Sequence, residues 1–85
     1  MSNEASIRIR VKLYATLAKY AGVPMMHEPI EVELPANATL TDLYDRLAIP
    51  PGEVKTSFVN SVMQSPDYTL SEGDQVGIFP PVGGG

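Results

Sequence analysis

The sequence predicts an α+β domain in which a mixed sheet curls around one principal helix. Three observations favour this fold class. Two segments in the first half of the chain alternate apolar with charged residues, one segment repeats apolar residues at helical spacing, and short apolar runs follow in the last third. The expected order is strand, short helix, strand, helix, two short strands and a final strand. We expect this final strand to lie centrally in the sheet, parallel to the first.

The two alternating segments predict strands with one buried and one solvated face. In residues 7–13 aliphatic side chains alternate with arginine and lysine, and in residues 30–34 they alternate with Glu31 and Glu33. If the two strands pair antiparallel, the glutamates face the basic residues across the sheet. Each such pair stabilises the sheet by about 0.2 to 1 kcal/mol. A solvated sheet face explains these charges better than a functional basic patch does.

Two further segments predict helices. Residues 15–21 are rich in helix formers and stop at Gly22, which predicts a short helix. The main helix is expected to begin at Thr39, which can cap it together with Asp42, and to end near Ala48, because prolines follow. The residues expected to face the core are Leu17 with Tyr20 or Ala21 in the short helix, and Leu40, Leu43, Tyr44 and Leu47 in the main helix.

The last third of the chain predicts three short strands. Residues 58–63 form two of them around a turn at Asn60–Ser61, although serine is a poorer second residue than glycine for a type I′ turn. In residues 75–79 the alternation leaves Phe79 on the face opposite the apolar one. Phe79 and Met63 are therefore candidates for a partner-facing apolar patch, and plain core packing is the alternative for each.

Composition excludes several function classes. The chain of 85 residues has no cysteine and one histidine, His27, so disulfides, thiolate chemistry and cysteine metal sites are excluded and no side-chain metal site is expected. The net charge of −4 argues against nucleic acid as a partner. No signal peptide or membrane-spanning run is recognisable, so we expect a cytoplasmic protein that binds no membrane. All six cationic residues lie at or before Lys55, which favours a basic partner for the acidic C-terminal part.

The C-terminal segment has the composition of a projecting tail. Two prolines cannot continue a strand ladder, and three glycines offer no side chain to a core. We therefore expect residues 1–79 to form the folded domain and residues 80–85 to form a flexible tail. Fully extended, this tail reaches about 20 Å at about 3.3 Å per residue, enough to carry the terminal carboxyl into another protein.

Several motifs carry a family resemblance that spans nearly the whole chain. They are residues 11–17 leading to Ala21-Gly22, residues 38–43, Val59-Asn60, the Glu72-Gly73-Asp74-Gln75-Val76 turn, and Phe79-Pro80-Pro81-Val82 before the terminal glycines. With these motifs the sequence resembles the ubiquitin-like, β-grasp sulfur carriers of the MoaD/ThiS family, in particular the small subunit of molybdopterin synthase. The resemblance implies a β-grasp fold, with the mixed sheet packed on one main helix plus a short helix.

The resemblance also implies a function. A ubiquitin-activating-like enzyme would use ATP to adenylate the carboxyl of Gly85, and sulfur transfer would then give a thiocarboxylate. The tail would enter the large subunit of molybdopterin synthase and donate its sulfur in molybdenum cofactor biosynthesis. Gly84 and Gly85 would carry the chemistry, and the carrier itself would bind no cofactor. The residues expected to contact a partner are Met63, Phe79, Pro80, Pro81, Val82 and Gly83.

Other readings stay open at this stage. The Phe-Pro-Pro-Val ending favours the molybdopterin branch over the thiamine branch, which stays an alternative, and carriers with this ending also suit tungsten cofactor or other sulfur pathways. The same activated glycine suits a ubiquitin-like modifier joined to lysines. A non-covalent interaction module with an inert glycine tail is a third alternative. An enzyme acting alone would have only His27 as a conventional base. The chain departs from the family at Gly83, where another small residue is usual, and at Ser61, where glycine is usual.

Overall fold

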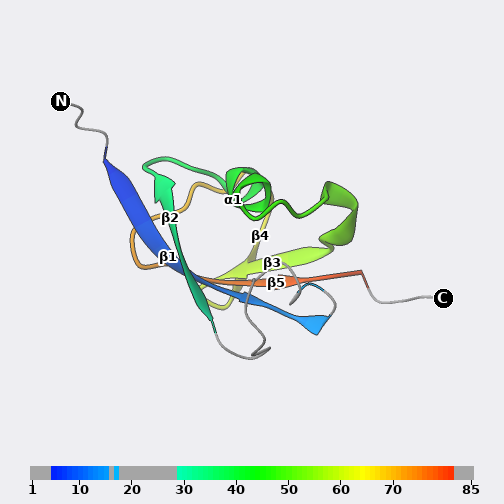
Figure 1. Ribbon diagram of the computed structural model, residues 1–85. Coiled ribbons are helices and arrows are strands. Elements are labelled where there is room, and N and C mark those ends of the chain that lie inside the picture. The colour runs from blue at the N-terminus through cyan, green and yellow to red at the C-terminus, as the bar shows by residue number, and fades with distance from the viewer. Residues whose placement is uncertain (1–4, 16, 18–28, 82–85) are drawn as a thin grey trace.

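The computed structural model describes residues 5–15, 17 and 29–81. In this part of the chain one α-helix packs on a five-stranded mixed sheet of order β2-β1-β5-β3-β4 (Figure 1). The elements are β1 (Ser6–Leu13), β2 (Ile30–Pro35), α1 (Leu40–Arg46), a 3₁₀ turn η2 (Pro51–Glu53), β3 (Thr56–Val59), β4 (Val62–Gln64) and β5 (Gln75–Phe79). The predicted α+β class is confirmed, and the final strand is central and parallel to β1.

Strands β1 and β2 pair antiparallel, as their alternation predicts. The register places Arg8 opposite Glu33 and Arg10 opposite Glu31. The expected match fails only for Lys12, because the paired residues end at Val11 and Ile30. The cross-strand charge match therefore covers two of the three basic residues.

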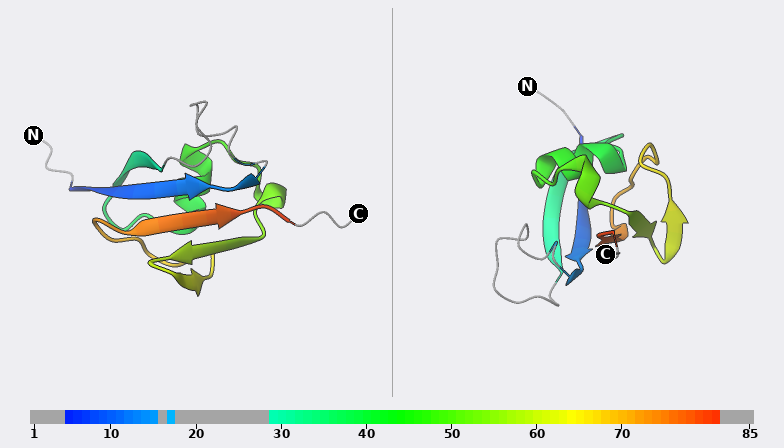
Figure 2. Two further views of the ribbon diagram at one scale, coloured as in Figure 1. Left: turned by 90° about the horizontal axis from the view of Figure 1, so that it is seen from below. Right: turned by 90° about the vertical axis from the view of Figure 1, so that its right-hand side faces the viewer.

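One face of the sheet packs under α1 and forms the core. Figure 2 shows α1 behind the strands when the sheet is viewed from below. Leu17, predicted to face inward, is fully buried, whereas most of the predicted short helix and its Gly22 cap lie outside the described residues. The buried aliphatic and aromatic residues include Ile7, Ile9, Val11, Leu13, Leu17, Val32, Leu34, Leu40, Leu43, Tyr44, Ile49, Val59, Val76 and Ile78.

The main helix begins and ends as its sequence predicts. The Thr39 hydroxyl accepts from the backbone N–H of Asp42, and the Asp42 carboxylate accepts from the backbone N–H of Thr39, which completes a capping box. At the other end Ala48 adopts a left-handed conformation with φ of 60°, and the N–H of Ile49 donates to the Tyr44 carbonyl. This pattern is a Schellman motif with alanine where glycine is usual.

The β3–β4 hairpin turns through Asn60 and Ser61, whose φ angles of 52° and 73° are those of a type I′ turn. The Asn60 side chain explains how serine is accommodated. Its Nδ2 donates to Asp74 Oδ1 at 2.9 Å, and its Oδ1 accepts from the Gln75 N–H at 3.0 Å. Asp74 in turn accepts from the Ser71 N–H at 2.8 Å. We call Asn60, Asp74 and their bonded neighbours the hairpin clamp, because they fix this turn to the start of β5.

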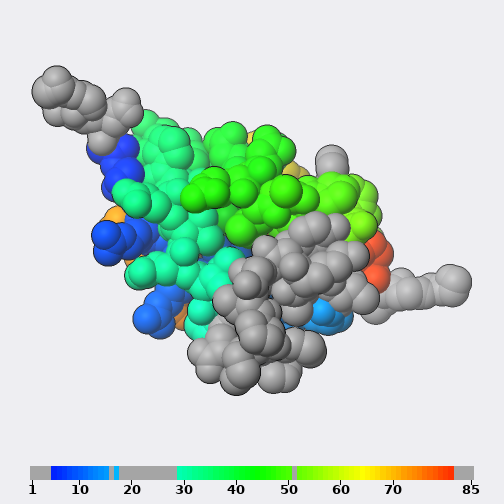
Figure 3. Space-filling model, in the orientation of Figure 1, coloured from blue at the N-terminus to red at the C-terminus, as the bar shows by residue number. Residues whose placement is uncertain are grey.

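Figure 3 shows the surface over β2 and α1, where the side chains of the two elements form one continuous outer layer.

Tyr44 lies on the inner side of α1. Burial raises the pKa of its hydroxyl, while the hydrogen bond of this hydroxyl to Ser57 lowers it. No helix among the described residues is long and apolar enough to span a membrane.

Candidate partner surface at the C-terminal strand

The predicted site residues fall into two groups in the structure. Phe79 and Met63 lie on the sheet, and Pro80 and Pro81 follow β5 without regular secondary structure. Val82, Gly83, Gly84 and Gly85 lie outside the described residues. The projecting tail and the chemistry at Gly84 and Gly85 therefore stay predictions, and the geometry available is that of the strand that leads to them.

Phe79 lies on the face of the sheet opposite α1, which we call the open face. Its ring stacks on Tyr14 with centroids 4.2 Å apart and planes at 10°, and meets the edge of Phe58 at 5.6 Å. All three rings are half-buried. Phe79 is thus neither a core residue nor an isolated exposed one, because it packs in a separate aromatic cluster outside the main core.

Sequence reasoning singled out neither Tyr14 nor Phe58. Tyr14 continues the outward alternation of β1, but it borders the segment that resembles a helix. Phe58 reaches the open face because it pairs with Gly77 across β3 and β5. The alternation of side chains along each strand shows which residues share a face, but the register between strands is needed to show that Tyr14 and Phe58 lie near Phe79. That register is known only from the fold.

A row of residues crosses the open face at the level of Gly77. Lys12 pairs with Gly77 on β5, Gly77 pairs with Phe58 on β3, and Phe58 pairs with Met63 on β4. Directly opposed residues share a face of the sheet, so Met63 lies on the same face as the aromatic cluster. The two partner-facing residues chosen from the sequence are therefore linked through Phe58.

Gly77 leaves a hollow in this row. A Cβ at this position would lie 3.3 Å from the Tyr14 ring and 3.7 Å from the Phe79 ring. The hollow has a volume of about 540 Å³, and its only charged lining residues are Arg10 and Lys12. The Lys12 Nζ lies 5.5 Å from the centre of the Tyr14 ring. The hollow therefore combines aromatic surface with positive charge, although the chain as a whole is acidic.

The base of the C-terminal segment is held on both sides. The Tyr14 N–H donates to the Ile78 carbonyl at 3.1 Å, and the Lys55 N–H donates to the Phe79 carbonyl at 2.9 Å. The hairpin clamp fixes the other end of β5. β5 therefore presents Pro80 and Pro81 from a rigid central strand beside the aromatic cluster.

Within the described ranges, no three His, Cys, Asp or Glu side chains gather as metal ligands. The side chains that line the hollow at Gly77 are aromatic, basic or neutral, whereas Glu31 and Glu33 lie on the same face at the β2 edge, opposite Arg10 and Arg8. Aromatic and basic side chains of this kind are enriched at protein interfaces.

Comparison with solved structures gives several close likenesses. A Pyrococcus furiosus protein assigned as molybdopterin converting factor subunit 1 superposes with a TM-score of 0.68 at 29% identity, over 89% of this chain and 99% of that one. SAMP1 from Haloferax volcanii gives 0.67 at 26% identity, over 92% and 99%. The HVO 2177 protein of the same organism gives 0.72 at 26% identity, over 100% and 92%.

Comparison with curated protein sequences yields no match. The model of the ThiS family, in contrast, matches residues 11–85, which include every strand after the first half of β1 and the terminal glycines. The likenesses extend the same conclusion to the fold, since the five-stranded mixed sheet with one helix is that of the β-grasp proteins. On the length of this match, the chain belongs to the ThiS family, whose members here share the ubiquitin-like β-grasp fold.

Proposed function

We propose that this chain carries sulfur as a thiocarboxylate on Gly85 and delivers it in molybdopterin biosynthesis. The observation that supports the proposal most directly is the family match, which runs through β5 to the terminal glycine. The chain has no cysteine, so sulfur cannot be carried as a cysteine persulfide or disulfide, and an activated carboxyl is the carrier group that fits. The described residues lead to that terminus from a rigid strand beside an aromatic surface.

The chemistry requires an enzyme in trans. The Gly85 carboxylate attacks the α-phosphorus of ATP on a ubiquitin-activating-like enzyme, which releases pyrophosphate and gives an acyl adenylate. Attack by hydrosulfide-level sulfur on the acyl carbon then expels AMP and leaves the thiocarboxylate. Glycine at the last two positions keeps this carbon sterically open, so that the tail fits a narrow channel.

The open face is the docking surface in this proposal. Tyr14, Phe58 and Phe79 supply an aromatic patch next to the tail, and Arg10 and Lys12 add positive charge. Met63 extends the patch to β4. The same face would meet the activating enzyme and then the large synthase subunit, one after the other, in the cytoplasm. Prolines at 80 and 81 limit the conformational entropy lost when the tail is inserted.

A mass measurement tests the proposal. The chain is incubated with a cognate activating enzyme, ATP and sulfide, and replacement of one oxygen by sulfur should raise the intact mass by about 16 Da. A variant lacking Gly84 and Gly85 is the matched control, because it should fold with an unchanged melting temperature and gain no mass. Absence of the gain on the full chain under conditions that adenylate it would refute the carrier assignment.

A second candidate is protein modification. It is favoured by the likeness to SAMP1, the small archaeal modifier protein 1, from Haloferax volcanii. In that case Gly85 would be found in isopeptide bonds to lysines of other proteins. Digestion followed by mass spectrometry separates the two functions, since a modifier leaves a glycine-containing remnant on the target lysine.

A further inference from the structure

The two edges of the sheet differ in how they are protected. The β2 edge carries Glu31 and Glu33 and ends at Pro35, three features that oppose pairing with another strand. The β4 edge has none of them, since no charged residue or proline occurs from Thr56 to Ser65. Figure 2 shows β4 at the outer margin of the sheet, where it pairs with β3 alone among the described strands.

The hairpin register turns one residue of β4 outward. Val59 and Val62 flank the two-residue turn and form a hydrogen-bonded pair, so the next pair, Phe58 and Met63, is of the non-hydrogen-bonded kind. The N–H and C=O of Met63 therefore point away from β3, and no described residue bonds to them. The side chains of Val62 and Met63 are 57% and 63% exposed. The β4 edge thus offers the N–H and C=O of Met63 for pairing, beside the exposed apolar side chains of Val62 and Met63.

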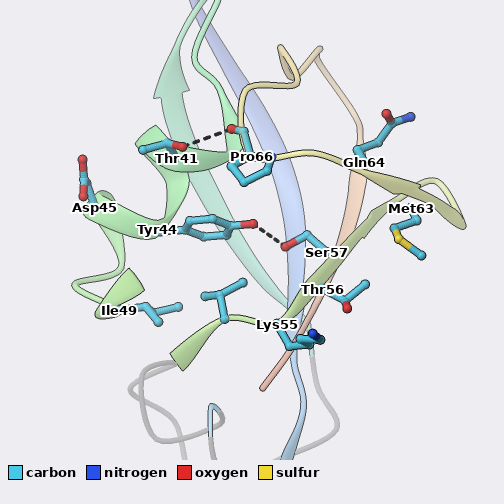
Figure 4. Close-up of a pocket in the computed structure, with 11 residues that line it drawn as sticks. Thr41, Tyr44, Asp45, Ile49, Lys55, Thr56, Ser57, Met63, Gln64 and Pro66 are labelled. Atoms are coloured by element: carbon cyan, nitrogen blue, oxygen red, sulfur yellow. Dashed lines mark hydrogen bonds between the residues drawn. The ribbon is translucent and has the colours of Figure 1, made fainter. Parts of the chain in front are cut away.

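A cavity of about 220 Å³ adjoins this edge on the helix side of the sheet. Figure 4 shows Tyr44 crossing it toward Ser57, with Asp45 and Ile49 on one side and Met63 and Gln64 on the other. The Tyr44 and Ser57 hydroxyls bond to each other, so the inner polar groups already have partners. The cavity therefore accepts an apolar side chain at little cost in desolvation.

We propose that β4 and this cavity form a docking groove for an extended segment of a partner protein. The segment adds a sixth strand through the Met63 backbone and places one large apolar side chain in the cavity, as in strand addition generally. Asp45 and Lys55 are the charged residues of the cavity lining, so a segment with one basic residue that can approach Asp45 is favoured. A second basic residue close to Lys55 is disfavoured.

A second copy of the chain fits this groove less well. Two-fold pairing of β4 with itself joins only three residues from each copy, far below the roughly 1,000 Å² that a stable interface needs. The net charge of −4 on each copy adds repulsion. A peptide avoids both penalties, because it gains strand pairing and cavity filling together.

The test uses the full chain, labelled with ¹⁵N, and two acetylated, amidated hexapeptides: Lys-Thr-Val-Leu-Val-Thr and the same sequence with lysine last. At least one should shift the amide signals of residues 61–65 on titration, since backbone pairing needs no unique sequence. The peptide that binds more tightly to the unaltered protein should bind the Asp45→Asn variant no more tightly than the other peptide does. Failure of both peptides to shift these signals would overturn the proposal.

Two comparisons isolate backbone pairing. Methylation of alternate peptide nitrogens should weaken binding at least about tenfold on the unaltered protein, because the donors toward Met63 are lost. Met63→Pro removes the outward N–H without removing a bond to β3 and should have a similar effect, whereas Met63→Ala should retain most of the affinity. Binding that survives peptide methylation would also refute strand addition, whether or not Met63→Pro folds.

The groove shares Met63 with the docking surface of the proposed carrier function, but its cavity contains neither the tail nor the aromatic cluster of Tyr14, Phe58 and Phe79. Removal of Gly84 and Gly85, which abolishes sulfur transfer in that proposal, should leave peptide binding unchanged. Phe79→Ala should likewise leave it unchanged, because Phe79 does not line the cavity. Glu33→Lys on the protected β2 edge is the matched surface control. A peptide affinity that fell with the tail deletion would show that the peptide occupies the tail's environment and not the β4 groove.

Discussion

The two faces of the sheet carry different kinds of side chain. The face under α1 is covered by aliphatic residues such as Ile9, Leu43 and Ile78, all at most 1% exposed. The open face carries the half-buried rings of Tyr14, Phe58 and Phe79, with basic residues beside them. The side chains that stabilise the fold are therefore concentrated on one face, so mutations can separate stability from the recognition that we propose for the other face.

The largest expected loss of stability comes from a mutation in the core between α1 and the sheet. Leu43→Ala should destabilise the domain by about 2 to 5 kcal/mol, because it removes a fully buried side chain and leaves a cavity that the single helix cannot close. Urea denaturation followed by circular dichroism measures this loss. Val62→Ala, at a 57% exposed position, is the control and should change stability little. Equal losses at the two positions would contradict the division of the sheet.

The hairpin clamp, which fixes the β3–β4 turn to the start of β5, has the second largest expected effect on stability. Asn60→Ala should cost about 2 to 3 kcal/mol, because it leaves the buried Asp74 carboxylate without one donor and the Gln75 N–H without its acceptor. The free energy of unfolding by denaturant measures the effect. Asn60→Gly separates the causes, since glycine keeps the positive φ without the side chain. A harmless Asn60→Gly would show that backbone strain, and not the clamp, explains the loss.

Phe79→Ala should separate recognition from stability on the open face. It removes a stacked ring from a cluster outside the main core, so the expected stability loss is at most about 1.5 kcal/mol. Binding to the activating enzyme should weaken by about 2 kcal/mol or more, as for a central interface residue. Calorimetric titration and thermal melting on the same preparation give both values. A large fall in melting temperature with unchanged binding would identify the ring as core instead.

The features that the sequence predicts are those set by residues close together in the chain. Strand alternation located the core residues of β1 and β2, and the Thr39–Asp42 pair located the start of α1. The open face depends on register between distant segments: Phe58 faces Tyr14 and Phe79 only because β3 and β1 both flank β5. The clamp is non-local in the same way, since Asn60 and Asp74 are fourteen positions apart and meet through the fold.

The smallest expected change in stability comes from a mutation at the C-terminal end of α1. Ala48 holds a φ of 60°, where its Cβ is strained and glycine is not. Ala48→Gly should therefore raise stability by about 0.5 to 1 kcal/mol, less the entropy that glycine adds to the unfolded chain. Differential scanning calorimetry resolves such a shift in a domain of this size. Thr41→Gly, in the first turn of the same helix, is the contrasting variant and should lower stability, because glycine gains nothing from its freedom there and the hydroxyl bond to the Pro66 carbonyl is lost. If both variants lowered stability, the Schellman geometry would contribute no strain for glycine to relieve.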